Sequence, residues 1–323
     1  MARPKVLLTR RWPEPVERRL AERYEVTLNG ADAPMSADQI AEALRDFDAV
    51  CPTVSDILSA EVLERGRGQA RIIGNYGVGV NHIDLEASRR LGLVVTNTPD
   101  VLTDATAELA ILLMMMAARR AGEGERHLRA GQWTGWRPTH MVGAEVTGST
   151  LGLIGFGRIA QAAARKARHG LGMRILYNSR RRAGPEVEAE CGAQFVGSVD
   201  ELVAQADFVS LHCPGGPETH HLIDARRLGL MKPTAFLINT ARGPVVDEAA
   251  LAQALAEGKI AGAGLDVYER EPQVDERLLK LENVVLLPHL GSATAQTRTA
   301  MGLRVARNLD AFFDGEEPPD RLV

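Results

Sequence analysis

The sequence predicts an α/β protein made of two doubly wound parallel sheets. Short β-rich runs alternate with segments of helical periodicity from residue 5 onward, and the same alternation begins again after residue 149. The length of 323 residues is also too great for one average domain and suits two, each large enough to bury its own core. We therefore expect two α/β domains.

The first half of the chain contains five predicted strands separated by helical segments. The strands are the runs 5–9, 25–29, 48–53, 71–76 and 93–98, and the clearest helical patterns are residues 13–24 and 36–47. A long apolar helix is predicted to begin near Asp104. Its most apolar run, 109–118, is about half of the ~20 residues that span a bilayer, so we interpret it as buried.

The second half repeats the pattern with six further strands. They are the runs 150–155, 174–179, 207–212, 234–240, 262–267 and 283–288, separated by helices such as residues 247–258. The Gly- and Trp-containing loop 130–143 lies in the region between the two halves. Residues 294–315 form a last helix with an apolar stripe, Met301, Val305, Leu309 and Phe312, which could cover either domain.

Composition and charge favour a small-molecule partner. The apolar share of 45% and the net charge of −4 are ordinary for a globular protein and give no reason to expect nucleic acid or membrane binding. The cysteines are odd in number and lack CxxC spacing, which favours a reducing cytoplasm over a disulfide framework or a zinc site: Cys51, Cys191 and Cys213. The first residues lead directly into the run 5–9 without a signal-peptide core, which also favours the cytoplasm.

The sequence gives no reason to expect a bound metal ion. His220 and His221 are adjacent and follow Glu218 in a polar segment, but their spacing is not that of a metal-binding motif. We therefore predict no metal site.

The segment LGLIGFGRIA at residues 151–160 predicts a dinucleotide site. Gly155 permits a tight turn after a strand, and Gly157 allows the backbone to approach a pyrophosphate at the start of the following helix. The small Ala160 allows close packing of helix and strand. Glycines often mark structural turns only, but here strand, loop and helix occur in the required order. Arg158 and Ile159 complete the predicted cofactor contacts.

The end of the next predicted strand favours NADP over NAD. An NAD site would place Asp or Glu there for the ribose hydroxyls, about 20 residues after the glycines. The chain instead has Asn178, then Ser179, Arg180, Arg181 and Arg182, and a guanidinium would bind a 2′-phosphate that a carboxylate would repel. The alternative is that the arginines form a solvated turn.

Three ionisable residues follow three successive strands of the second half. Arg242, Glu271 and His289 come after the strands 234–240, 262–267 and 283–288, and parallel sheets bind ligands at the carboxyl ends of their strands. An arginine can hold a carboxylate and polarise a ketone, while a histidine supported by a carboxylate can give and retrieve a proton near neutral pH. Each residue alone could be a surface group, but their joint position predicts a catalytic site.

The first half contributes the loop Gly77-Val78-Gly79. It lies between the strand 71–76 and a helix predicted to begin in NHIDLEASRR, so its backbone N–H groups could bind an anion at a helix start. A turn without a ligand is an equal alternative.

The whole chain resembles the D-isomer-specific 2-hydroxy acid dehydrogenases. The matching blocks, in that family's order, are NYGVGVNHIDL, DATAELAILLM, TLGLIGFGRIA, INTARGPVVDEAAL, AGAGLDVYEREP and LLPHLGSAT. The resemblance implies that Arg242, Glu271 and His289 are catalytic, and that Val78 and Gly79, together with Arg242, bind the substrate carboxylate. It implies further cofactor contacts from Thr106, Cys213, Pro214, Thr240, Asp266, His289 and Gly291.

The resemblance also implies a domain arrangement. A flavodoxin-like substrate domain would comprise residues 1–98 and 288–323, around an inserted NAD(P)-binding Rossmann domain of residues 99–287. Within the family, the stretch WTGWRPTHMVGAEVTGSTLG is most similar to the glyoxylate and hydroxypyruvate reductases, in which Trp136 would reach the substrate pocket of a neighbouring subunit. A homodimer through the dinucleotide-binding domains is implied, and Trp136 and Trp133 could alternatively only fill its interface.

Several other activities are compatible with the same fold and residues. Phosphoglycerate, phosphite and D-lactate dehydrogenases are alternatives within the family, while formate dehydrogenases place glutamine where this chain has Glu271. A cofactor-sensing corepressor would keep the three ionisable residues, so they do not exclude a binding protein without catalytic turnover.

Overall fold

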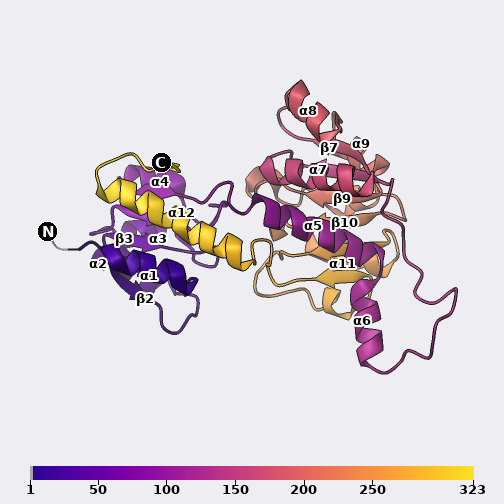
Figure 1. Cartoon of the computed structure of the whole chain (residues 1–323), viewed down its shortest axis with the longest axis horizontal. Coiled ribbons are helices and arrows are strands. Elements are labelled where there is room, and N and C mark those ends of the chain that lie inside the picture. Colours follow the sequence, from indigo (N-terminus) through magenta and orange to yellow (C-terminus); the bar gives the residue numbers. More distant parts are fainter. Residues whose placement is uncertain (1–2) are drawn as a thin grey trace. The chain divides into compact units, whose positions relative to one another are not determined.

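The computed structural model describes residues 3–323, which form two compact units. Unit 1 combines the described residues up to Leu102 with Ser292–Val323, and unit 2 is the continuous segment Thr103–Gly291 (Figure 1). Unit 2 is thus inserted into unit 1 along the chain. The limits predicted from the sequence lie a few residues before these.

Unit 1 contains one parallel sheet of five strands. Its strands are short and apolar, as expected for strands that are covered on both faces. In spatial order they are β2 (Glu25–Leu28), β1 (Lys5–Leu8), β3 (Ala49–Cys51), β4 (Ile72–Gly74) and β5 (Val94–Thr96). Each matches a run predicted from the sequence.

Helices cover both faces of this sheet. On one face, buried strand residues such as Leu7, Val50 and Ile73 share a core with α2 (Ala37–Asp46), α3 (Ala60–Arg65) and α4 (Leu85–Arg90). On the other face, the last helix, α12 (Ala295–Phe313), packs against α1 (Glu14–Arg23) and β4 (Figure 1). The apolar stripe of α12 therefore belongs to unit 1, which periodicity alone did not decide.

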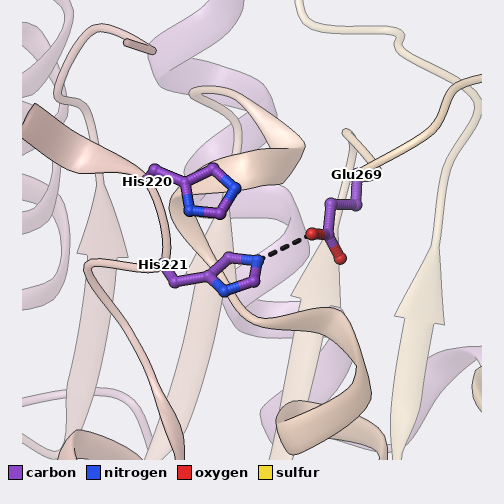
Figure 2. Close-up of side chains that lie close together, drawn as sticks. All are labelled: His220, His221 and Glu269. Atoms are coloured by element: carbon purple, nitrogen blue, oxygen red, sulfur yellow. Dashed lines mark hydrogen bonds and ion pairs between the residues drawn. The ribbon is translucent and has the colours of Figure 1, made fainter. Parts of the chain in front are cut away.

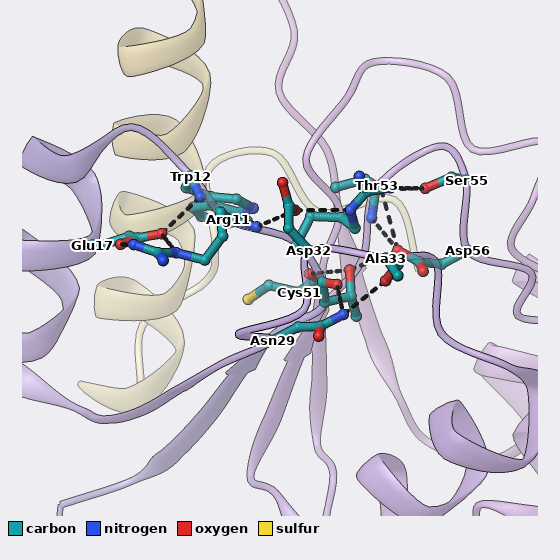
Figure 3. Close-up of polar contacts among 12 residues, drawn as sticks. Arg11, Trp12, Glu17, Asn29, Asp32, Ala33, Cys51, Thr53, Ser55 and Asp56 are labelled. Atoms are coloured by element: carbon teal, nitrogen blue, oxygen red, sulfur yellow. Dashed lines mark hydrogen bonds and ion pairs between the residues drawn. The ribbon is translucent and has the colours of Figure 1, made fainter.

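Hydrogen bonds join the loops at the carboxyl edge of the first sheet (Figure 3). The buried carboxylate of Asp56 accepts from the Thr9 hydroxyl at 2.6 Å and from the Thr53 amide at 2.8 Å. The Asn29 side chain donates to the Thr9 carbonyl at 2.9 Å. The segments that follow β1, β2 and β3 are therefore fixed relative to one another.

Unit 2 contains one parallel sheet of seven strands. In spatial order they are β12 (Val284–Leu286), β11 (Gly262–Leu265), β10 (Phe236–Asn239), β9 (Phe208–Leu211), β6 (Thr150–Ile154), β7 (Arg174–Asn178) and β8 (Ala193–Phe195). The strand order reverses between β6 and β9, which is where such sheets bind ligands. Six strands match the predicted runs, and the edge strand β8 was not predicted.

Two helical layers cover the second sheet. One contains α5 (Thr103–Ala118), α7 (Arg158–Leu171) and α8 (Pro185–Cys191), and the other contains α9 (Val199–Gln205), α10 (Ala225–Leu228) and α11 (Glu248–Ala256). Helix α6 (Ala121–Arg129) buries none of its residues and stands away from these layers, followed by a long loop (Figure 1). Across residues 3–323, no helix has both the length and the apolar character needed to cross a membrane.

Candidate active site

The glycine loop lies at the reversal of strand order in unit 2. Gly155 follows β6 and has a φ of +85°. A Cβ atom at this position would lie 2.7 Å from the backbone nitrogen of Cys213, which follows the neighbouring strand β9. Both the left-handed backbone and the close approach require glycine. This turn holds the loop against the segment that carries Cys213 and Pro214.

The start of α7 is open, as a phosphate-binding helix requires. Gly157 is the N-cap residue of α7, and an added Cβ there would meet nothing within 4 Å. Ala160 is fully buried, and the first turn contains no acidic residue that would repel an anion. The N–H groups of this helix start point toward the position where a phosphate would bind.

The turn after β7 contains three arginines, of which two form ion pairs with described residues. Arg180 pairs with Glu218 at 3.0 Å, and Arg182 pairs with Glu188 at 2.9 Å. Arg181 is exposed and forms no ion pair with any residue between 3 and 323. Hydrogen bonds from Arg182 and Tyr177 lower the pKa of Glu188 to about 2, so this carboxylate is charged and engaged with Arg182.

His289 and Glu271 form a hydrogen-bonded pair at the carboxyl edge of the sheet. Nδ1 of His289 lies 2.8 Å from Oε2 of Glu271. The backbone of His289 is left-handed, with a φ of +55°, and its amide donates to the Asp266 carbonyl at 2.9 Å. Strained residues of this kind are frequent at functional sites. The pair leaves Nε2 of His289 for a substrate.

The Glu271 carboxylate is held in its charged form. Burial alone would raise its pKa, but the hydrogen bond and charge of His289, the Tyr268 amide and the charge of Arg242 together lower that pKa. Tyr268 donates its backbone N–H to Oε1 at 3.1 Å, so both carboxylate oxygens have partners. The charged carboxylate thereby holds the imidazole of His289 in one orientation.

Arg242 reaches the same edge from the end of β10. Its side chain packs over Gly215, where an added Cβ would lie 3.0 Å from Cγ of the arginine, and its Nη1 donates to the Ala241 carbonyl at 2.7 Å. Burial lowers the pKa of the guanidinium and the charge of Glu271 partly restores it. Arginine nevertheless remains charged in proteins, so the site contains a cation, an anion and an imidazole.

Two buried carboxylates shape the loops that carry this pair. Asp266 accepts from the amides of Leu290 at 2.6 Å and Gly291 at 2.8 Å, which fixes the loop after His289. Glu248 accepts from the amides of Glu269 at 2.9 Å and Asp275 at 2.7 Å, on either side of Glu271. Glu248 was not predicted as a site residue. In the sequence it looks only like an acidic residue in the first turn of a helix.

Further predicted cofactor residues lie beside the loop and the pair. Thr106 of α5 is buried near Gly291, and its side chain would lie 3.5 Å from a Cβ added there. The Oγ1 atom of Thr240 is buried without a hydrogen-bond partner in the described chain. Such an orphaned buried hydroxyl needs a partner, and a bound molecule could provide one.

The predicted carboxylate loop of unit 1 does not lie at a helix start. Helix α4 begins at Leu85, capped by Asp84, within the predicted segment 81–90 but several residues after the loop. The carbonyls of the loop are occupied, since Asn75 and Asn97 donate to Gly79 and Val78 at 3.1 Å and 2.9 Å. The N–H groups of Val78 and Gly79 donate to no residue that the structure describes. They remain available to an anion.

Two features of unit 2 lie elsewhere. Trp136 is 81% exposed and Trp133 is 53% exposed in the loop after α6.

A pocket of about 560 Å³ lies at the amino ends of β10 and β12, lined by residues such as Met116, Phe236 and Val285. We place the chemical site at the carboxyl edge instead, because the charged groups and the glycine loop are there.

The doubly wound sheet, the glycine loop at its reversal point and the neighbouring ionisable groups define an NAD(P)-binding oxidoreductase. The sequence profile described as "D-isomer specific 2-hydroxyacid dehydrogenase, NAD binding domain" matches residues 111–291. The chain belongs to the D-isomer specific 2-hydroxyacid dehydrogenase family.

Named relatives align over nearly the whole chain. The glyoxylate reductase of Thermococcus onnurineus is 49% identical over 98% of this chain and 95% of its own length. Among solved structures, the NADPH-dependent glyoxylate/hydroxypyruvate reductase of Sinorhizobium meliloti, in complex with NADP and malonate, is 34% identical with a TM-score of 0.88, covering 100% and 97% of the two chains. A glyoxylate reductase from Paecilomyes thermophila is 33% identical with a TM-score of 0.87, covering 100% and 99%.

Proposed function

We propose that this protein reduces small 2-oxo acids, with glyoxylate and hydroxypyruvate as substrates and NADPH as the coenzyme. The observation that carries the proposal is the presence of Arg242, Glu271 and His289 at the sheet edge that also holds the Gly155 loop. The names of the relatives support the choice of substrate. The products would be glycolate and D-glycerate.

The residues around the glycine loop suit a dinucleotide. Gly155 and Gly157, with Arg158 and Ile159, would hold the pyrophosphate at the start of α7, and the orphaned hydroxyl of Thr240 would gain a partner. Thr106, Cys213, Pro214, Asp266 and Gly291 would line the remainder. Ser179, Arg180 and Arg181 would receive the 2′-phosphate, with the unpaired Arg181 supplying most of the charge.

The reaction would use each charged group in a separate role. When bound, the reduced nicotinamide supplies a hydride to the carbonyl carbon. Arg242 would hold the substrate carboxylate and carbonyl oxygen, and as the C=O electron pair moves to that oxygen, Nε2 of His289 would donate a proton to it. Glu271 would keep His289 oriented through Nδ1.

The two units would have different tasks. Unit 2, which contains the glycine loop, would be the dinucleotide-binding domain, and unit 1 would be the substrate domain. In unit 1, the N–H groups of Val78 and Gly79 would bind the substrate carboxylate. This assignment follows the predicted division into 1–98 with 288–323 and 99–287.

A homodimer through unit 2 completes the proposal. Apolar side chains are exposed on α6 and the loop after it, including Leu128, Trp136 and Val142, and such patches commonly mark interfaces. Trp136 would reach the substrate pocket of the neighbouring subunit. A monomeric mass in solution would contradict both the homodimer and the role of Trp136 in the neighbouring pocket. The three free thiols suit a reducing compartment, and we infer a cytoplasmic location.

Initial rates with four substrates and two coenzymes test this function. Glyoxylate, hydroxypyruvate, pyruvate and phenylpyruvate are each assayed with NADH and NADPH. We expect the highest kcat/KM for glyoxylate or hydroxypyruvate with NADPH. Higher rates with NADH for every substrate would overturn the assignment of the coenzyme, and negligible turnover of all four would favour a cofactor-sensing protein.

A further inference from the structure

Two histidines and a glutamate from distant parts of the sequence meet in unit 2. His220 and His221 follow the short helix η1 (Pro217–Thr219), and Glu269 lies in the loop after β11 (Figure 2). Nε2 of His221 is 2.7 Å from Oε1 of Glu269. One ligand atom from each of the three side chains can be chosen so that all lie within 4.8 Å of one another. In the sequence, the acidic residue beside these histidines is Glu218. The proximity of Glu269 in the folded chain was not predicted.

The backbone places both imidazole rings on the same side of the chain. Neighbouring side chains of an extended segment point in opposite directions. Here His221 has a left-handed backbone, with a φ of +48°, and its N–H donates to the Pro244 carbonyl at 2.8 Å. The two rings consequently stack with their centroids 4.0 Å apart (Figure 2). An unfavourable conformation is thus retained at the point where it brings two nitrogen ligands together.

Two further carboxylates, those of Asp247 and Glu248, lie beside this cluster. Oδ2 of Asp247 lies 4.0 Å from Nδ1 of His221, the ring nitrogen that faces away from Glu269. A histidine that binds a metal through one nitrogen usually directs the N–H of the other toward a carboxylate. Glu248 fixes Glu269 by accepting its backbone N–H at 2.9 Å. Glu248 therefore fixes the backbone of Glu269, and Asp247 places a negative charge near the outer nitrogen of His221 without a hydrogen bond.

We propose that His220, His221 and Glu269 bind a divalent transition metal ion of the zinc class. Two imidazoles and one carboxylate form a donor set that suits Zn²⁺, whereas Mg²⁺ and Ca²⁺ prefer oxygen ligands alone. With its proton on Nδ1 toward Asp247, His221 would coordinate through Nε2. The exposed His220 would turn its ring toward the same ion, and water would occupy the fourth position. The proposal is independent of the proposed reductase activity.

Titration of the metal-free protein with Co²⁺ tests this site directly, because Co²⁺ replaces Zn²⁺ and absorbs visible light. We expect one Co²⁺ per chain, with absorption bands that Zn²⁺ abolishes. His221→Asn and Glu269→Gln should weaken Co²⁺ binding at least tenfold, and asparagine tolerates the left-handed backbone. His220→Asn should also weaken it and alters an exposed side chain only.

Two control variants separate this site from the other histidines. His140 forms a second ring pair with His127, and His289 pairs with Glu271. His140→Asn and His289→Asn should keep the Co²⁺ bands of the wild type. Bands that persist in both His220→Asn and His221→Asn, or that disappear only in His289→Asn, would overturn the proposal. Absence of binding at millimolar Co²⁺ would do the same.

Thermal unfolding provides a second readout that does not depend on activity. An ion that binds only the folded chain raises Tm, and the increase grows with the logarithm of the ratio of ion concentration to Kd. Zn²⁺ should raise the Tm of the wild type and of His140→Asn more than that of His221→Asn or Glu269→Gln at the same Zn²⁺ concentration. Equal increases in all four proteins would contradict a site at this cluster.

Discussion

Nδ1 of His289 and Oε2 of Glu271 lie 2.8 Å apart, although 18 positions separate the two residues in the sequence. The contact joins the loop after β11 to the loop after β12. It also explains why the pKa of Glu271 is lowered even though burial alone would raise it. The proposed acid and its supporting anion are therefore assembled by the fold of unit 2 itself.

Glu271→Gln should slow the reduction. The amide has nearly the shape of the carboxylate but carries no charge, so the contact that orients His289 through Nδ1 loses its charged partner. We expect kcat to fall at least about tenfold, measured as the initial rate at saturating substrate and coenzyme. The exposed Glu276→Gln in the same loop serves as the control and should keep the wild-type kcat. An unchanged kcat in Glu271→Gln would contradict the supporting role.

Gly155→Ala and Gly157→Ala should have different consequences. At Gly155 the added Cβ would clash with the backbone of Cys213, and the left-handed backbone there is unfavourable for alanine. We therefore expect Gly155→Ala to lose about 2 kcal/mol or more of the free energy of unfolding. At Gly157 the Cβ would enter open space where a phosphate would lie. Stability should be nearly unchanged while the Kd for NADPH rises. Denaturant unfolding and coenzyme titration distinguish the two, and equal stability of both variants would refute this argument.

Arg181→Ala should raise the KM for NADPH without changing the KM for NADH. Because Arg181 has no ion pair within residues 3–323, its guanidinium is available to a 2′-phosphate. We expect the KM for NADPH to rise about tenfold or more, the effect of losing a charged hydrogen bond, while the KM for NADH stays constant. The adjacent Arg182→Ala is the control, since Arg182 pairs with Glu188. Equal effects on both coenzymes would remove the phosphate role.

The Asp320 carboxylate should make unit 1 sensitive to acid. Burial would raise its pKa, but hydrogen bonds from Arg304 and Asn308 lower it overall. A lowered pKa in the folded state adds stability above the unfolded value of about 4, and this stability is lost as pH falls through the folded value. Asp320→Asn should cost about 3 kcal/mol at pH 7 and reduce the acid dependence below pH 4. Denaturant unfolding of the wild type and of Asp320→Asn, at pH 7 and at a pH below 4, measures the two effects. If the loss of unfolding free energy between the two pH values is the same in both proteins, the role of Asp320 is contradicted.

Local patterns predicted most of the fold because each buried strand is a continuous apolar run. β6 and β10 could be read directly from TLGLI and FLIN. The strand β8 escaped because it has three residues at the sheet edge and buries none of them fully. The predicted segment NHIDLEASRR contains α4, but its first residue, Leu85, is defined only by the cap that Asp84 forms in the structure.

Interactions between distant loops could not be predicted from local patterns. The strand ends indicated that Arg242, Glu271 and His289 share one edge, since parallel strands end together. In contrast, nothing near Glu248 indicates that its carboxylate binds the amides of Glu269 and Asp275. The approach of Glu269 to His221 also depends on how two loops fold. Such contacts become visible only in three dimensions.

Replacement of His289 by asparagine tests the central claim most directly. Asparagine tolerates the left-handed backbone at this position but cannot donate a proton as an acid. We predict that kcat for glyoxylate reduction with NADPH falls about 10²- to 10⁴-fold, with unfolding unchanged. His169→Asn, at an exposed position of α7, should remain as active as the wild type. Near-normal turnover in the folded His289→Asn variant would contradict the assignment of His289 as the acid.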